Sequence, residues 1–247
     1  MDLSVIITTY NRWGKTKKLL DSLSGYINKD ITKEIIIIDN NSQDETIEQL
    51  KNYDVKVMKN KTNIRLLADN IGFKEAQGKY ILRLDNDIVF NSPFYDQFLD
   101  ALNRKNVGLV VPLMNYGGKH QKSDSLFNDV VLNKYKFGSS VWFFRKSLLE
   151  EIGNIDSKFA YYCNDLDFQL RVLQRGYYIA IARVLVIHDN ISSLAITENG
   201  EKIREARQFL YEKWGNFLIQ LYGPKDNFEE GYQTFAEKIL KDLEANK

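Results

Sequence analysis

The first 90 residues alternate between short apolar runs and amphipathic segments, and this alternation restricts the fold more than any other feature of the chain. The apolar runs are residues 3–8, 34–38, 55–58 and 80–84, and the segments between them are 15–23, 44–51 and 66–77, the last followed by Gly78. Short runs rich in isoleucine, leucine and valine predict strands that are buried on both faces. Strands that alternate with helices predict an α/β fold with a parallel, doubly wound sheet.

The pattern changes after residue 90. We expect a helix at 93–103, a strand at 107–111, a long polar loop at 115–133 and a strand at 137–144. Helices at 146–152 and 165–174 should end before Gly153 and Gly176, and short strands should follow at 178–181 and 184–187. Amphipathic segments at 201–221 and 228–243 predict a helical tail, residues 201–247, after a domain of residues 1–200. This tail could pack on the domain, dimerise or lie on a membrane surface.

Composition excludes several classes of protein. The net charge of +1 gives no electrostatic footprint for nucleic acid. The single cysteine, Cys163, excludes an internal disulfide and a cysteine-based zinc cluster. No apolar run reaches the roughly 18 residues of a membrane-spanning helix, and the N-terminus lacks the pattern of a signal peptide. We therefore expect a cytoplasmic protein, with contact to the inner membrane face left open through the tail.

Two carboxylates follow the apolar run 80–84 directly, in the stretch KYILRLDNDIVF. In extended backbone Asp85 and Asp87 point to the same side. Ligands bind at the carboxyl ends of strands in open α/β sheets, and carboxylate oxygens suit hard cations such as Mg²⁺ or Mn²⁺. The triplet Asp85-Asn86-Asp87 is equally typical of a turn, so both interpretations stay open on these residues alone.

Three polar loops end predicted strands: residues 8–12, 39–42 and 85–87. In a parallel sheet with right-handed crossovers they share one edge, where they form a nucleotide crevice. The chain lacks the G-x-G-x-x-G dinucleotide motif and the G-x-x-x-x-G-K-[ST] phosphate loop. We therefore expect the phosphates to be held through a metal on the carboxylate pair.

Five stretches in order carry a resemblance to family-2 glycosyltransferases. They are SVIITTYNR (4–12), EIIIIDNNSQDET (34–46), NIRLLADNIGFKEAQGKYILRLDNDI (63–88), FRKSLLEEIGNIDSKFAYYCNDLDFQLRVLQRGY (144–177) and VLVIHD (184–189). The resemblance implies the GT-A fold, a Rossmann-like mixed sheet flanked by helices, with a nucleotide-binding half at about residues 1–110 and an acceptor half at about 111–200. It implies inverting transfer of a sugar from a nucleoside-diphosphate donor, of the UDP or dTDP class, to a hydroxyl of a glycan or other acceptor, with Mn²⁺ or Mg²⁺ as cofactor.

The resemblance also implies roles for the polar residues at the strand ends. Asp87 and His188 would ligate the metal, while Asp85 would face the nucleotide ribose or reach the metal through water. Asp165, the second residue of the acidic motif 164–167, would be the catalytic base. His188 could instead be a satisfied buried histidine, and Asp165 an acid favoured by the helix dipole. Asn164 departs from the glutamate that the family often has, and Asp167 is expected to be structural.

The residues expected to bind the nucleotide sugar are Thr8, Tyr10, Asp39, Arg65, Asp85, Asn86 and Gly138. Asp39 could alternatively cap the helix that begins near residue 44, although Ser42 could do that instead. Arg65 stands where the family commonly has glycine, and it would contact the base or diphosphate or simply face solvent. Trp142 could stack on a sugar or pack in the core.

Two other functions are compatible with parts of the sequence. Haloacid-dehalogenase-type phosphatases also carry a D-x-D-x-[TV] motif, but by resemblance that motif belongs on the first strand of their fold, and here three strand–helix units precede it. A non-enzymatic module of the same fold could bind a nucleotide or a partner. The presence of Asp87, Asp165 and His188 together argues for an enzyme instead.

Overall fold

The computed structural model describes residues 1–116, 131–133, 140–188 and 199–222. Its strands are β1 (Leu3–Thr9), β2 (Lys33–Asp39), β3 (Lys56–Lys59), β4 (Tyr80–Asp85), β5 (Ile88–Phe90), β6 (Val107–Tyr116), β7 (Val131–Asn133), β8 (Val141–Arg145) and β9 (Tyr178–His188). Its α-helices are α1 (Trp13–Tyr26), α2 (Thr46–Leu50), α3 (Ala68–Glu75), α4 (Tyr95–Asn103), α5 (Leu148–Ile152), α6 (Asn164–Gln174) and α8 (Gly200–Tyr222). Two 3-10 turns, η1 (Arg65–Leu67) and η3 (Ser157–Phe159), precede α3 and α6.

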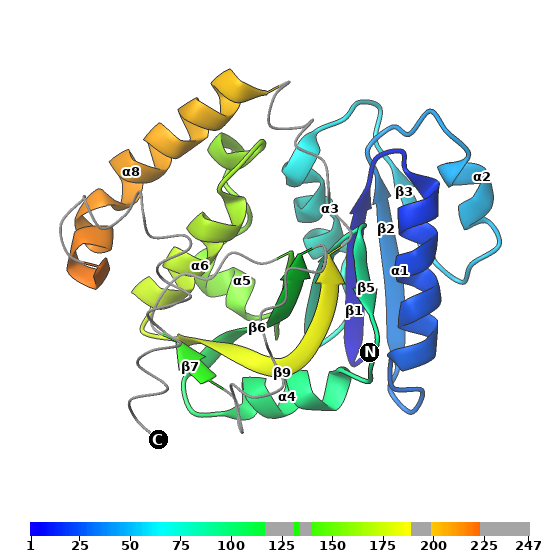
Figure 1. The fold of residues 1–247 in the computed structure, drawn as a ribbon, viewed down its shortest axis with the longest axis horizontal. Coiled ribbons are helices and arrows are strands. Elements are labelled where there is room, and N and C mark those ends of the chain that lie inside the picture. Colours follow the sequence, from blue (N-terminus) through cyan, green and yellow to red (C-terminus); the bar gives the residue numbers. More distant parts are fainter. Residues whose placement is uncertain (117–130, 134–139, 189–198, 223–247) are drawn as a thin grey trace.

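These strands form one mixed sheet in the order β3-β2-β1-β4-β8-β6-β9-β5, and β7 pairs with β9 (Figure 1). The first four are parallel, as the alternating pattern predicts. Thr8 lies opposite Asp85 of β4, and Thr9 lies opposite Asp39 of β2. The three polar loops therefore start at the same edge of the sheet, as expected.

The second half of the sheet is mixed. β8 is antiparallel to β4 and β6, whereas β6 and β9 are parallel. β9 is a single strand where two short ones were expected, and its register against β6 shifts between Pro112 and Leu113. Such an irregularity interrupts the apolar alternation without ending the strand. β5 pairs antiparallel with β9 and places Ile88 opposite His188.

Several other boundaries differ from the prediction, and the strand expected at 137–144 is β8, which begins at Val141 and ends at Arg145. The helix expected at 66–77 is η1 followed by α3, which ends at Glu75 with Ala76 as its C-cap, before the predicted end at residue 77. Gly78 instead lies against β1, where an added Cβ would be 2.4 Å from the backbone nitrogen of Ser4. The loop expected at 115–133 is partly strand, because β6 continues to Tyr116 and β7 begins at Val131. Residues 117–130 lie outside the described ranges.

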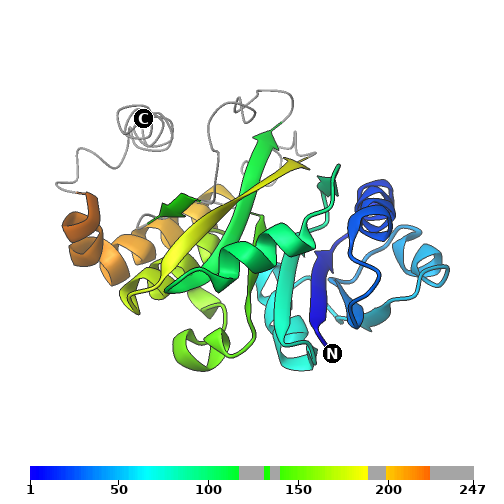
Figure 2. The same cartoon turned by 90° about the horizontal axis from the view of Figure 1, so that it is seen from below.

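Apolar residues cover both faces of the sheet. α1 and α4 pack on one face, and α3, α5, α6 and α8 pack on the other. α8 lies at the opposite end of the sheet from α1 and α2 (Figure 2). Its buried residues are Ile203, Ala206, Leu210, Trp214 and Leu218. The tail was expected to pack on the domain, dimerise or lie on a membrane surface. Its described part, α8, packs on the domain.

A buried carboxylate joins α8 to α6. Asp167 accepts a hydrogen bond from Trp214 Nε1 at 2.9 Å and pairs with Lys213 at 2.8 Å. Its other oxygen accepts from Arg171 Nε at 2.9 Å. Asp167 thus has the structural role expected of it.

Within the described residues no helix is long and apolar enough to cross a membrane. The second tail helix expected, at 228–243, lies outside them.

Candidate active site

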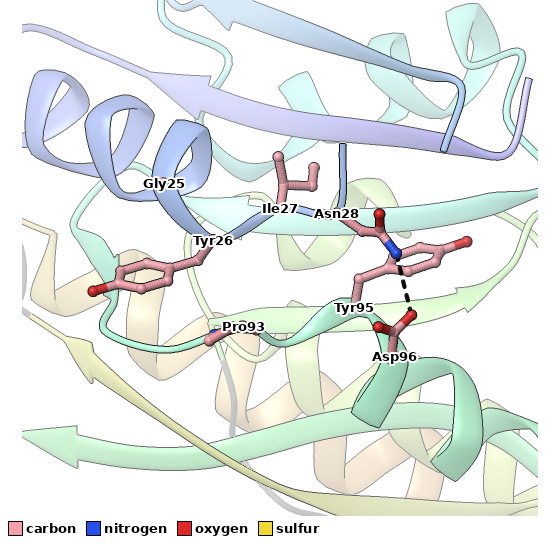
Figure 3. Close-up of a pocket in the computed structure, with 7 residues that line it drawn as sticks. All are labelled: Gly25, Tyr26, Ile27, Asn28, Pro93, Tyr95 and Asp96. Atoms are coloured by element: carbon pink, nitrogen blue, oxygen red, sulfur yellow. Dashed lines mark hydrogen bonds between the residues drawn. The ribbon is translucent and has the colours of Figure 1, made fainter. Parts of the chain in front are cut away.

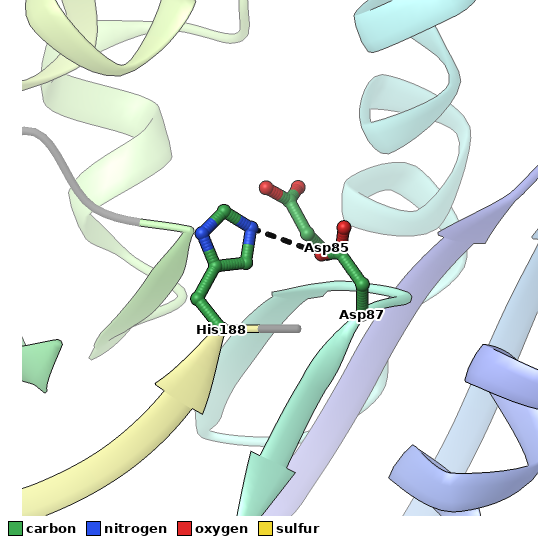
Figure 4. A group of neighbouring side chains, drawn as sticks. All are labelled: Asp85, Asp87 and His188. Atoms are coloured by element: carbon green, nitrogen blue, oxygen red, sulfur yellow. Dashed lines mark ion pairs between the residues drawn. The ribbon is translucent and has the colours of Figure 1, made fainter. Parts of the chain in front are cut away.

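Asp85, Asp87 and His188 converge at the carboxyl edge of the parallel strands (Figure 4). One ligand atom from each lies within 4.8 Å of the others. Asp85 ends β4, but Asn86 and Asp87 form a turn into β5 rather than a continued strand. The expectation that extended backbone aligns the two acids is therefore wrong. The turn brings Asp87 beside Asp85, so the triplet is both a turn and a cluster of carboxylates.

The side chain of Asn86 holds this turn against the end of β1 and the first turn of α1. Its amide donates to the hydroxyls of Thr9 at 3.2 Å and Thr16 at 3.1 Å. Those two hydroxyls are themselves 2.9 Å apart and buried. The amide of Asn86 is thus engaged in the protein, and its predicted contact with the nucleotide stays a prediction.

His188 and Asp87 form an ion pair, with Nε2 3.0 Å from Oδ1. Burial disfavours the charged imidazolium, but the neighbouring Asp87 carboxylate outweighs it and raises the pKa of His188 above 6.5. Burial likewise disfavours the charged form of Asp87, and His188 outweighs it to hold the pKa of Asp87 below 3.8. A proton on His188 therefore compensates the carboxylate charge in the metal-free protein.

This pair predicts a pH dependence of stability in the presence of a chelator. A raised histidine pKa contributes stability that is fully present below pH 6.5 and is lost as pH rises through the folded-state pKa. We expect the free energy of unfolding, measured by urea titration, to fall over that range, and His188→Asn to remove this component. If the free energy of unfolding of the variant had the same pH dependence as that of the wild type, the pair of His188 and Asp87 would not be its source.

The donor set fits a divalent cation. Two carboxylates and one imidazole offer oxygen and nitrogen ligands that suit Mn²⁺, and the oxygens also suit Mg²⁺. Asp87 and His188 are 6% and 8% exposed, so their ligand atoms are largely withdrawn from water before any ligand binds. The cluster also lies at the edge where α/β sheets bind ligands.

The other strand ends supply a polar lining. Asp39 is fully buried, and its Oδ2 accepts from the backbone of Ser42 at 3.0 Å, whereas its Oδ1 has no hydrogen-bond partner among the described residues. Asp44, not Asp39 or Ser42, accepts the backbone N–H at the start of α2. Thr8 donates to Asp69 at 2.6 Å, and Tyr10 is 42% exposed. A buried carboxylate oxygen of this kind needs a donor from beyond the described residues, such as a water molecule or a ligand.

Arg65 adopts a left-handed backbone conformation with φ of +58°. Its N–H donates to Asn63 and its carbonyl accepts from Asn40, so this conformation is held from both sides. Its guanidinium lies over the Tyr161 ring, 5.5 Å from the centroid. Left-handed backbone favours glycine, the residue that the family resemblance leads one to expect at this position.

Arg65 therefore gives a test that separates backbone from side chain. Because both variants lose the guanidinium but only alanine has a Cβ, Arg65→Gly should be more stable than Arg65→Ala by about 1 kcal/mol. Urea unfolding measures this difference. Equal stabilities would contradict the backbone argument, and an equal rise in donor KM in both variants would assign the donor contact to the guanidinium.

Asp165 lies in the first turn of α6, where negative charge is favoured by the helix dipole. Cys163, just before α6, has φ of +65° and turns the chain into the helix. Asp165 is half-buried and close enough to Arg83 of β4 to act on it electrostatically. The negative charge of Asp165 adds to those of Asp69 and Asp85 in favouring the protonated guanidinium of Arg83.

Arg83 lies inside the strand that the sequence pattern predicts as an apolar run, and the pattern assigns it no role. It is 2% exposed, and it pairs with Asp69 and Asp85, each at 2.7 Å. Burial disfavours its charge, but the two carboxylates outweigh burial and raise the pKa of Arg83 above its ordinary value. The available signal was a charged residue inside an otherwise apolar central strand, which requires a buried partner.

Two further positions complete the comparison with the sequence. Trp142 is fully buried, stacks on Phe168 and lies under Arg83, so it belongs to the core rather than to a sugar platform. Gly138 lies outside the described residues.

A separate cavity of about 320 Å³ lies between the end of α1 and the start of α4, where Asn28 donates to Asp96 (Figure 3). It shares no residue with the acid–histidine cluster.

Comparison with known proteins identifies the class. The model of glycosyl transferase family 2 matches residues 4–165, and the chain belongs to this family. The poly(ribitol-phosphate) beta-N-acetylglucosaminyltransferase TarP of Staphylococcus aureus is 23% identical over 282 aligned residues, covering 96% of this chain and 85% of TarP. An uncharacterized glycosyltransferase of Haemophilus influenzae is 25% identical over 185 residues, covering 70% of this chain and 62% of the relative.

Solved structures show the same fold. GalNAc-T7, crystallised with UDP, GalNAc and Mn²⁺, superposes with a TM-score of 0.65 at 15% identity over 76% of this chain and 44% of its own. S. aureus TarS 1–349 superposes with a TM-score of 0.57 at 17% identity over 92% of this chain and 77% of its own. The chain is thus a glycosyltransferase with a GT-A fold, which excludes the phosphatase alternative.

Proposed function

We propose that this protein is an inverting, divalent-metal-dependent glycosyltransferase that moves a sugar from a nucleoside-diphosphate donor to an acceptor hydroxyl. The observation that carries the proposal is the convergence of Asp85, Asp87 and His188 at the carboxyl edge of the sheet. Family membership supports the transfer reaction, and the GalNAc-T7 neighbour bound UDP and Mn²⁺ on the same fold.

In this proposal Asp87 and His188 hold Mn²⁺ or Mg²⁺, and Asp85 serves the metal or the nucleotide from the adjacent strand end. The cation supplies Lewis-acid stabilisation of the charge that gathers on the leaving diphosphate. Asp39, Thr8, Tyr10 and Arg65 line the nucleotide side, and residues of about 1–110 form the nucleotide-binding half. Oδ1 of Asp39, which has no hydrogen-bond partner within the part of the chain that the structure describes, supports a contact with a donor group of the nucleotide.

Asp165 acts as the general base. It accepts the proton of the acceptor hydroxyl while that oxygen bonds to the anomeric carbon and the carbon–diphosphate bond breaks. One base and one in-line displacement invert the anomeric configuration. The half-buried position of Asp165 in the first turn of α6 and its match to the acidic motif of the family support this role. The acceptor half, about residues 111–200, and the C-terminal tail would select the acceptor.

The donor and acceptor can be tested directly. The names of the similar proteins suggest UDP-GlcNAc and UDP-GalNAc as first donors and a polyol-phosphate or glycan as first acceptor. Product formation with Mn²⁺ should be followed by chromatography, and the anomeric configuration of the new bond by NMR coupling constants. An inverted product that forms only with metal is expected. Retention of configuration, or transfer in a chelator, would contradict the mechanism.

A further inference from the structure

The guanidinium of Arg83 lies between two carboxylates, one in the interior of the protein and one at the candidate site. Its Nε lies 2.7 Å from Oδ2 of Asp69, and its Nη1 lies 2.7 Å from Oδ1 of Asp85. The Asp69 side chain is fully buried, whereas the Asp85 side chain is 33% exposed at the candidate site. The guanidinium also lies 4.8 Å from the Trp142 ring centroid, so it is held by charge on its edge and by an aromatic ring on its face.

Stability alone does not explain the second contact. A buried guanidinium is costly without a partner, and Asp69 already provides one in the interior. Asp69 is itself held, because its Oδ1 accepts from Thr8 at 2.6 Å. With Nε fixed in this way, the planar guanidinium presents Nη1 to Asp85 in one orientation. The charge of Asp165 also favours the protonated form of the same guanidinium.

We propose that Arg83 is a positioning residue for sugar transfer: it fixes the carboxylate of Asp85 in the orientation seen beside Asp87 and His188. Preorganised groups avoid the cost of reorientation when the donor complex forms, and a misplacement of about 1 Å can cost about 100-fold in rate. A chain of contacts thus runs from Thr8 near the end of β1 through Asp69 and Arg83 to Asp85. This inference rests on the proposed metal-dependent transfer.

The test removes both buried charges at once. The double variant Asp69→Asn/Arg83→Met keeps the net charge of the protein and leaves no uncompensated buried ion, so it should fold with a melting temperature close to that of the wild type. In this variant Asp85 loses the contact with the guanidinium that fixes its orientation. We expect kcat to fall between about 10- and 100-fold and the half-saturating Mn²⁺ concentration to rise, with the acceptor KM unchanged.

Arg83→Lys gives the second comparison. It keeps a cation beside Asp69 but replaces the planar fork by a single ammonium, which cannot hold both carboxylates in the same geometry. Its kcat should fall as in the double variant. All variants are assayed well below their own melting temperatures.

The outcomes separate this inference from the function on which it rests. If the wild type shows no Mn²⁺-dependent transfer, the proposed function fails. If the wild type transfers sugar and either the double variant or Arg83→Lys retains wild-type kcat and Mn²⁺ dependence, Arg83 only neutralises Asp69 and the positioning role is wrong.

Discussion

Asp165→Asn should bind the donor and Mn²⁺ as the wild type does but lose nearly all transfer. The amide has almost the shape of the carboxylate and cannot accept the acceptor proton, so kcat should fall by about 10²–10⁴-fold. Quenched-flow or steady-state product assays measure the loss, and calorimetry with the nucleoside diphosphate measures binding. Asp165 lies in the first turn of α6 and is not one of the three grouped ligands, which predicts this separation of chemistry from binding.

The matched control is Asp100→Asn, the same chemical change at an exposed carboxylate of α4. It should leave kcat unchanged. If Asp165→Asn also retained near-normal turnover, another group would have to be the base. Asp167 is a poor alternative, because both of its oxygens are engaged by Trp214, Lys213 and Arg171 in the interior.

Asp87→Ala, in contrast to Asp165→Asn, should lose the metal-dependent binding of the donor. It removes one ligand of the proposed metal and leaves His188 without its carboxylate partner. Loss even of a supporting group costs roughly 10–100-fold in metal affinity, so loss of a ligand should cost at least about 100-fold. Calorimetric titration of the nucleoside diphosphate with Mn²⁺ should show no metal-dependent component of binding in this variant.

Asp54→Ala, at an exposed position between α2 and β3, is the control and should bind metal and donor normally. Retained metal-dependent donor binding in Asp87→Ala would show that the cation is held elsewhere. The two variants, at Asp165 and Asp87, therefore divide the site into a group that moves a proton and groups that hold the leaving diphosphate.

The parallel half of the fold could be predicted because its signal is local. Each strand there is an apolar run, each connection is a helix, and the strand-end loops with Asp39 and Asp85 fall on one edge by topology alone. The pairings of β8, β6 and β9 are long-range and change direction, and no local pattern encodes them. His188 was reached only through the family resemblance, since its approach to Asp87 depends on the pairing of β5 with β9.

The buried charges show where local patterns were insufficient. Arg83 interrupts an apolar strand, and its partner Asp69 belongs to a helix fourteen residues earlier in the chain. Hydropathy identifies the strand but not the ion pair inside it. The turn at Asn86 and Asp87 was one of two open interpretations, and the structure shows that the turn itself creates the cluster.

The central claim is that Asp85, Asp87 and His188 hold the cation that binds the donor diphosphate. Anomalous X-ray scattering at the manganese edge tests it most directly, on crystals of the wild-type protein grown with Mn²⁺ and UDP. We predict one strong manganese peak in contact with Asp87 and His188 and adjacent to the diphosphate. Bound UDP with no manganese at these residues, or with manganese at a different group of ligands, would contradict the claim.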